Sequence, residues 1–245
     1  MCKLSSRLIK GRFGSCVLDG FGAPQLSKLT ECGAPEMENA ENYLKSFVLN
    51  GLFRAKHSKK INKFILMFGR RADNAVKEYR EGRDFLLSYV QRLPQGNDHF
   101  LQAFCAVTHF EQCIGSAYMA CTFQRCLMSL LEEMFQIDKC DANKDVEDRL
   151  KDIWNRAKHF DEDIAGDKIA NDLIAPVWLT NTGISATERP PKNPMERPPK
   201  NSIQTVTWEE LHKIITEQQT YLRFLAIDLP NKFAEEINQT EKHKL

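Results

Sequence analysis

Long apolar segments are absent from this sequence. The longest nearly apolar stretch, residues 113–123, is 11 residues long, whereas a helix that crosses a bilayer needs about 20. Residues 1–16 are basic but lack the continuous apolar run of a secretory signal peptide. We therefore expect a cytoplasmic protein that has no membrane partner.

The sequence also lacks an excess of charge of either sign. Its 34 Lys and Arg residues nearly balance its 33 Asp and Glu residues, which gives a formal net charge of +1. Proteins that bind nucleic acid or anionic membranes through an overall field are strongly basic. Any phosphate binding must therefore depend on a local group of side chains.

Metal-binding cysteine motifs are missing, although the sequence holds 8 cysteines. Cys105, Cys113, Cys121 and Cys126 fall in one predicted helix at spacings of 8, 8 and 5 residues, and none forms a Cys-x-x-Cys pair. Residues eight positions apart on a helix are about 12 Å apart, too far for a disulfide. We interpret these cysteines as small buried apolar residues of a reducing compartment, and we expect no metal.

Motifs of cofactor and nucleophile chemistry are missing as well. The chain has no Gly-rich phosphate loop, no Ser nucleophile elbow and no HExxH zinc motif. We therefore expect no cofactor, and a conventional metabolic enzyme is the least favoured interpretation.

Helical periodicity is the main pattern that the sequence does contain. Apolar residues recur at three- and four-residue steps, which predicts an all-α fold. We expect a bundle of four to six helices with a short extended or hairpin segment around 174–185. The predicted helices cover residues 38–52, 58–93, 98–135, 145–164 and 208–225.

The predicted domain organisation is simple. Residues 1–36 form a disordered or irregular segment, residues 37–228 a single helical domain, and residues 229–245 a tail. A Pro-rich loop at 186–202 contains the repeat ERPPKN, at 188–193 and again at 196–201. Its paired prolines favour an extended polyproline II linker, and a ligand for an SH3-type domain is the less favoured alternative.

Three polar residues interrupt the apolar middle of the predicted helix 98–135: His109, Glu111 and Gln112. A helix that is apolar nearly all round is a central helix, so we expect these residues to form a buried polar cluster. Buried polar groups need partners. The cluster is therefore either a structural network, which we favour, or part of a functional site.

The predicted helix 145–164 carries two stripes of side chains at helical spacing. One is an expected core face made of Leu150, Ile153, Trp154, Ala157, Phe160 and Ile164. The adjoining stripe holds the candidate site residues Arg149, Asp152, Arg156, His159 and Asp163, with Asn155 four positions before His159.

The spacing within this second stripe suggests a separate role for each side chain. Asp163 lies four residues after His159 and could orient its ring, and Asp152 lies four residues before Arg156 and could pair with it. His159 would transfer a proton while Arg156 would stabilise charge that develops on phosphate. These two roles suffice for phosphodiester cleavage without a metal.

The segment Asn155-Arg156-Ala157-Lys158-His159 in a helical bundle resembles the HEPN superfamily. The resemblance covers about residues 38–166, and its motif is short. Only two residues lie between Arg156 and His159, fewer than is usual in that family.

The resemblance implies a metal-independent endoribonuclease of a bacterial toxin-antitoxin or phage-defence system. Its partners would be RNA and a second copy of the chain or an antitoxin-like protein. His159 and Arg156 would be catalytic, with supporting roles for Asn155, Asp163, Asp152 and Arg149.

Two alternatives remain open from the sequence. The charged stripe is equally typical of a solvated helix face with weak ion pairs. The chain would then be a non-catalytic helical protein-protein interaction module that contacts a partner through Trp178, the Pro-rich loop and the helix 208–225. A nuclease requires Arg156 and His159 to converge on an accessible groove.

Overall fold

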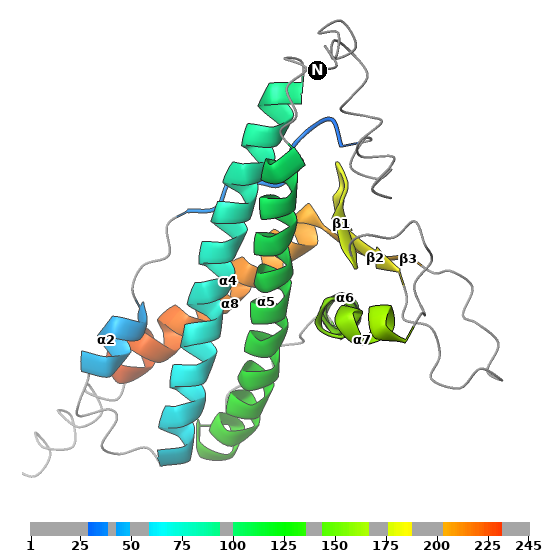
Figure 1. Ribbon diagram of the computed structural model, residues 1–245. Coiled ribbons are helices and arrows are strands. Elements are labelled where there is room, and N and C mark those ends of the chain that lie inside the picture. Colours follow the sequence, from blue (N-terminus) through cyan, green and yellow to red (C-terminus); the bar gives the residue numbers. More distant parts are fainter. Residues whose placement is uncertain are drawn as a thin grey trace, which may run out of the picture.

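The computed structural model describes residues 29–38, 43–49, 59–93, 100–135, 144–166, 176–187 and 203–231. Two long antiparallel helices, α4 (Lys59–Arg92) and α5 (Phe100–Phe135), form the frame of the molecule, and α8 (Trp208–Arg223) crosses them (Figure 1). The all-α bundle predicted from the sequence is confirmed. None of the described helices is both long and apolar enough to cross a lipid bilayer.

Shorter elements complete the fold at the two ends of α8. At its C-terminal end, η3 (Phe224–Asp228) continues the helix and packs against α2 (Tyr43–Leu49). At its N-terminal end lies a small sheet, against which α6 (Lys144–Lys158) packs, and α7 (Phe160–Ala165) follows α6.

The sheet has three antiparallel strands in the order β1-β2-β3: β1 (Val177–Leu179), β2 (Gly183–Thr187) and β3 (Ile203–Thr207). The first two form the hairpin that the sequence predicted, with Trp178 opposite Ser185. The third strand was not predicted, because five residues beside a Pro-rich stretch carry too short a pattern. The ERPPKN repeat lies outside the described residues.

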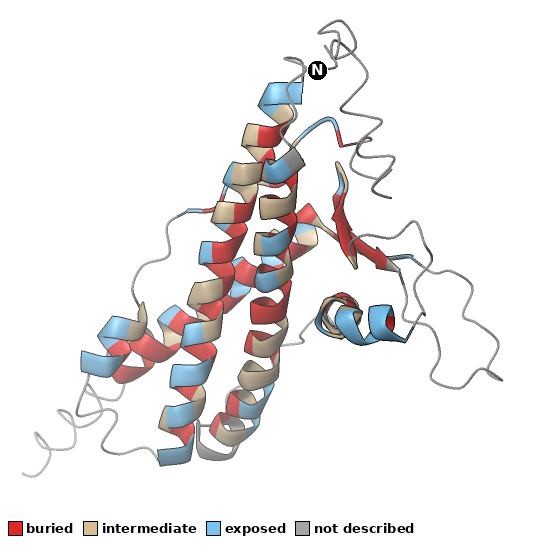
Figure 2. Ribbon diagram, viewed as in Figure 1, coloured by how far each residue is buried: buried red, intermediate tan, exposed pale blue. Residues whose placement is uncertain are grey.

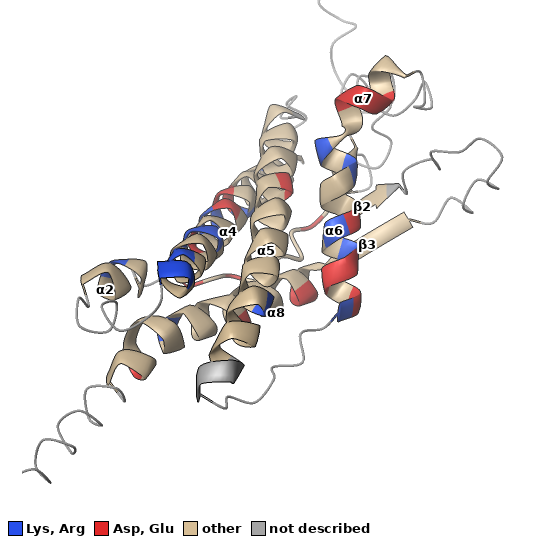
Figure 3. Ribbon diagram, turned by 90° about the horizontal axis from the view of Figure 1, so that it is seen from below, with Lys and Arg blue, Asp and Glu red and all other residues tan. Residues whose placement is uncertain are grey.

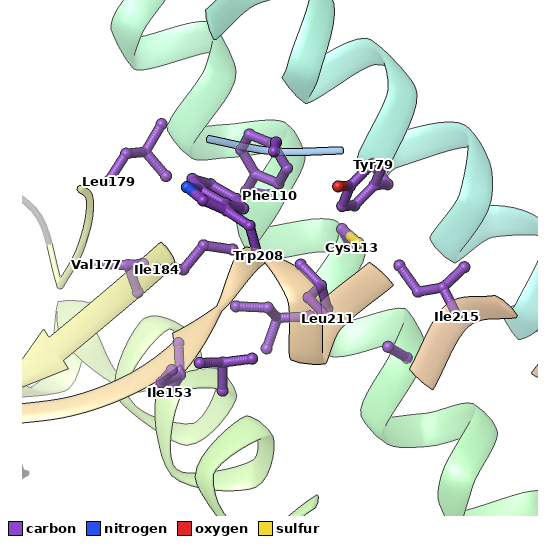
Figure 4. Close-up of a cluster of buried hydrophobic side chains, with 14 of the residues drawn as sticks. Tyr79, Phe110, Cys113, Ile153, Val177, Leu179, Ile184, Trp208, Leu211 and Ile215 are labelled. Carbon is purple, nitrogen blue, oxygen red and sulfur yellow. The ribbon is translucent and has the colours of Figure 1, made fainter. Parts of the chain in front are cut away.

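Trp208 joins the sheet to the helices. Its ring is almost fully buried, and its centroid lies 4.7 Å from that of the Phe110 ring on α5. Its indole Nε1 donates a 3.1 Å hydrogen bond to the backbone oxygen of Thr180. Figure 4 shows this ring between apolar side chains of the sheet and those of α5 and α8.

A capping box fixes the junction between β3 and α8, as the sequence predicted. The Thr207 hydroxyl accepts a hydrogen bond from the Glu210 backbone N–H, while the Glu210 carboxylate accepts one from the Thr207 N–H. These contacts satisfy two backbone donors that a helix start leaves unpaired. Strand and helix are therefore joined without a loop.

The middle of α5 is central, as expected, because residues 113–117 are all buried. Gly115 accommodates the Trp154 ring of α6, since a Cβ atom at this position would lie 2.6 Å from ring carbons. Cys113 and Cys121 are buried as predicted, and Cys105 is half-buried. Cys126 is exposed, so the prediction was wrong for this residue.

Residues 29–38 run without regular structure beside the bundle and contribute Leu29 and Ala34 to its core. The Tyr79 hydroxyl donates to the backbone oxygen of Pro35, and the Arg83 guanidinium donates to that of Ala34. Trp178 is also a core residue, at 8% exposure. Its side chain projects from the opposite face of β1 to Val177 and Leu179, which pack in the core, and it exposes little surface for the partner contact that the sequence suggested.

Candidate functional site

The candidate site lies where α6 ends and α7 begins. The sequence predicted one helix over 145–164, but the helix is interrupted at His159, whose backbone adopts φ −110° and ψ 17°. Basic residues occupy the last turn of α6 and acidic residues the first turn of α7. Both arrangements stabilise helix ends through the helix dipole, so this charge reversal is the signal that would have revealed the break.

The break changes which residues of α7 are buried. Ile164, predicted as a core residue, is 60% exposed, and Asp163 is fully buried in its place. Phe160 is only half-buried, and Asp161, which a continuous helix would have placed beside the core face, is exposed.

Arg156 and Asp163 form a buried ion pair across this junction. The Arg156 guanidinium Nη1 lies 2.5 Å from the Asp163 carboxylate Oδ2, and the two side chains are 5% and 1% exposed. The guanidinium also lies over the Phe160 ring, 5.8 Å from its centroid. A side chain enclosed in this way does not present its charge to a phosphate in solvent.

The imidazole of His159 meets a different carboxylate. Its Nδ1 is 3.1 Å from the Glu162 carboxylate, and its side chain is 29% exposed. The predicted role of Asp163 in orienting the imidazole was therefore wrong, because the helix break turns Asp163 toward Arg156. Of the other predicted site residues on α6, Asn155 is half-buried and Asp152 is exposed.

Arg149, also predicted to support the site, instead connects α6 to the sheet and to α8. Its guanidinium donates to both carboxylate oxygens of Glu210, to the backbone oxygen of Thr205 and to Asp145. The hydrogen bonds from Arg149 lower the pKa of Glu210 to about 2, from an ordinary value of 4.5.

Replacing Glu210 with glutamine should make the free energy of unfolding less sensitive to pH in the acidic range. Because its folded pKa is depressed, the Glu210 carboxylate stabilises the fold above about pH 4.5, and this contribution is lost as the pH falls toward about 2. We expect Glu210→Gln to lower the free energy of unfolding at pH 7 and to have little effect near pH 2. Urea denaturation of both proteins across this range measures the difference, and equal losses at both pH values would contradict the prediction.

The predicted buried cluster of His109, Glu111 and Gln112 does not form. Glu111 is half-buried and projects from a different side of α5 than His109, two positions away. Gln112 is exposed, because the part of the helix surface on which it lies is open to solvent. Burial still raises the pKa of Glu111 to about 7.

His109 instead meets two glutamates of α4. Its Nδ1 is 2.8 Å from the Glu78 carboxylate and 3.3 Å from that of Glu81. The possible ligand atoms of these three residues all lie within 4.8 Å of one another. Sequence reasoning missed the glutamates because only the register of α4 against α5 brings them to His109.

The α6–α7 junction and the group of His109 with two glutamates differ in the chemistry that they could support. The junction of α6 and α7 has an accessible imidazole beside a carboxylate, but the guanidinium of Arg156 is enclosed by a carboxylate and a phenyl ring. The group on α4 and α5 combines one imidazole with two carboxylates, a donor set that suits a metal ion. Comparison of the chain with models of protein families, with curated proteins and with solved structures gave no match.

Proposed function

We propose that this HEPN-like helical protein is a non-catalytic interaction protein. The observation that carries the proposal is the buried pair of Arg156 and Asp163, because a nuclease of the HEPN type needs that arginine beside an accessible His159. Arg156 then has a structural role, and the ribonuclease interpretation loses its phosphate-binding group.

A surface suited to a partner lies on the first turns of α4. Lys59, Lys60, Lys63 and Arg70 are exposed there, and Leu66 and Met67 lie between them, each 38% exposed. The segment 59–71 contains no acidic residue, and in the described ranges no carboxylate pairs with these four cations. Figure 3 shows the basic start of α4, and Figure 2 shows its exposed outer side.

We name residues 59–70 of this exposed side the basic face of α4. Four cations with two apolar side chains match an acidic protein segment that also carries apolar residues. Long-range attraction by the cations would speed association, and burial of Leu66 and Met67 would slow dissociation. The partner is therefore expected to be an acidic protein.

The binding test compares two charge-reversal variants. Lys63→Glu with Arg70→Glu alters the basic face, and Lys151→Glu with Lys158→Glu makes the same charge change on exposed residues of α6. We expect proteins captured from cell extract by the wild type and by the α6 variant to be lost with the α4 variant and released by added salt. Capture of RNA in place of protein, tested with nuclease-treated extract, would overturn this choice of partner.

The catalytic test uses purified full-length protein and diverse RNAs, with and without divalent metal. We expect no cleavage by the wild type. Cleavage that is lost in a folded His159→Ala variant would overturn the non-catalytic proposal and restore the ribonuclease interpretation. Circular dichroism and thermal melting of each variant must accompany the assay.

A further inference from the structure

Three potential metal ligands converge between the two longest helices. Glu78 and Glu81 are one turn apart on α4, and His109 lies opposite them on α5. The imidazole Nδ1 is within 3.3 Å of both carboxylates. This group involves neither helix of the α6–α7 junction, and on α4 it begins eight residues after Arg70, the last residue of the basic face.

Packing fixes the position of the imidazole. The Phe85 ring stacks on it with 5.3 Å between centroids and 11° between planes. Gly82 permits the close approach of the two helices, since a Cβ atom there would lie 3.2 Å from the His109 Cβ and 3.1 Å from the Phe110 ring. A ligand held in this way loses little conformational freedom when an ion binds.

The charges of the group favour a cation. Glu78 is 5% exposed, and a buried carboxylate is costly unless a positive charge accompanies it. Lys77 lies 3.9 Å from both glutamates, but its side chain is 63% exposed and remains largely hydrated. An ion between the three ligands would place two positive charges beside the buried carboxylate.

We propose that Glu78, Glu81 and His109 bind a divalent transition-metal ion of the zinc class. Tetrahedral coordination at bond lengths of about 2.1 Å separates neighbouring ligand atoms by roughly 3.4 Å. The His109 Nδ1 is 3.3 Å from the Glu81 carboxylate, close to this value, and 2.8 Å from that of Glu78, so the latter pair would move slightly apart when an ion binds. The imidazole favours zinc, iron, cobalt or nickel over magnesium and calcium. The carboxylate of Glu81 is half-exposed, so water completes the coordination from that side.

The test measures binding of Zn²⁺ and Co²⁺ to the full-length protein after treatment with a chelator. We expect one ion per chain by isothermal titration and elemental analysis. Glu81→Gln should weaken binding at least tenfold, because loss even of a group that only supports a ligand costs 10- to 100-fold. Asp84→Asn, an exposed acidic residue on the same helix, is the matched control and should bind as the wild type does.

Two outcomes would overturn the proposal. One is wild-type protein that binds neither ion, which would mean that the three side chains form only an ion-pair network. The other is an ion bound elsewhere. Binding that Glu81→Gln leaves unchanged would show this, and a thiolate charge-transfer band in the cobalt spectrum would place the ion at cysteines. His109→Asn provides a second variant if Glu81→Gln lowers the melting temperature.

Discussion

Replacing Arg156 with alanine is expected to lower the free energy of unfolding by about 3–5 kcal/mol. The substitution removes the guanidinium that lies 2.5 Å from the Asp163 carboxylate, and that carboxylate is fully buried. A buried charge that has lost its ion partner is far more destabilising than the pair is stabilising. Chemical denaturation monitored by circular dichroism measures the effect.

Two further variants make this result specific to the ion pair. Lys158→Ala removes an exposed cation from the same helix and should change stability by no more than about 0.5 kcal/mol. Arg156→Met with Asp163→Leu replaces the pair by apolar side chains and should recover most of the loss. If Arg156→Ala costs less than about 1 kcal/mol, the structural role proposed for this residue is wrong.

Replacing Trp208 with alanine should cost about 3–5 kcal/mol as well. The variant loses a fully buried ring that contacts Phe110, and it loses the hydrogen bond to the backbone oxygen of Thr180. The ring packs between the sheet and the helices, so the cavity left by the substitution would weaken the packing of the sheet and of the helices around it (Figure 4). Urea denaturation followed by circular dichroism gives the stability change.

Trp208→Phe is the control for that experiment. Phenylalanine keeps most of the apolar contact but lacks the indole N–H, so we expect a loss less than half as large, dominated by the unsatisfied oxygen of Thr180. Phe160→Ala, at a half-buried position, should also be milder. A Trp208→Ala variant as stable as the wild type would show that the ring does not link sheet and bundle.

Local patterns in the sequence were sufficient to predict most of the helices. Apolar residues at three- and four-residue steps located α4, α5 and α8, and the Thr207–Glu210 box located the start of α8. These predictions succeeded because helix periodicity and capping depend on residues only a few positions apart. The break at His159 was equally local, in the change from basic to acidic residues.

The tertiary structure decided what the polar side chains do. Whether Arg156 faces phosphate or Asp163, whether Trp178 faces a partner or the core, and whether His109 meets Gln112 or the glutamates of α4 depend on how elements pack. A helical pattern places side chains on a face, but the neighbouring elements determine which atoms lie opposite that face. Partners that are distant in the sequence leave no local pattern. The sequence therefore identified the polar residues of α6 and α5 but could not predict which side chains they contact.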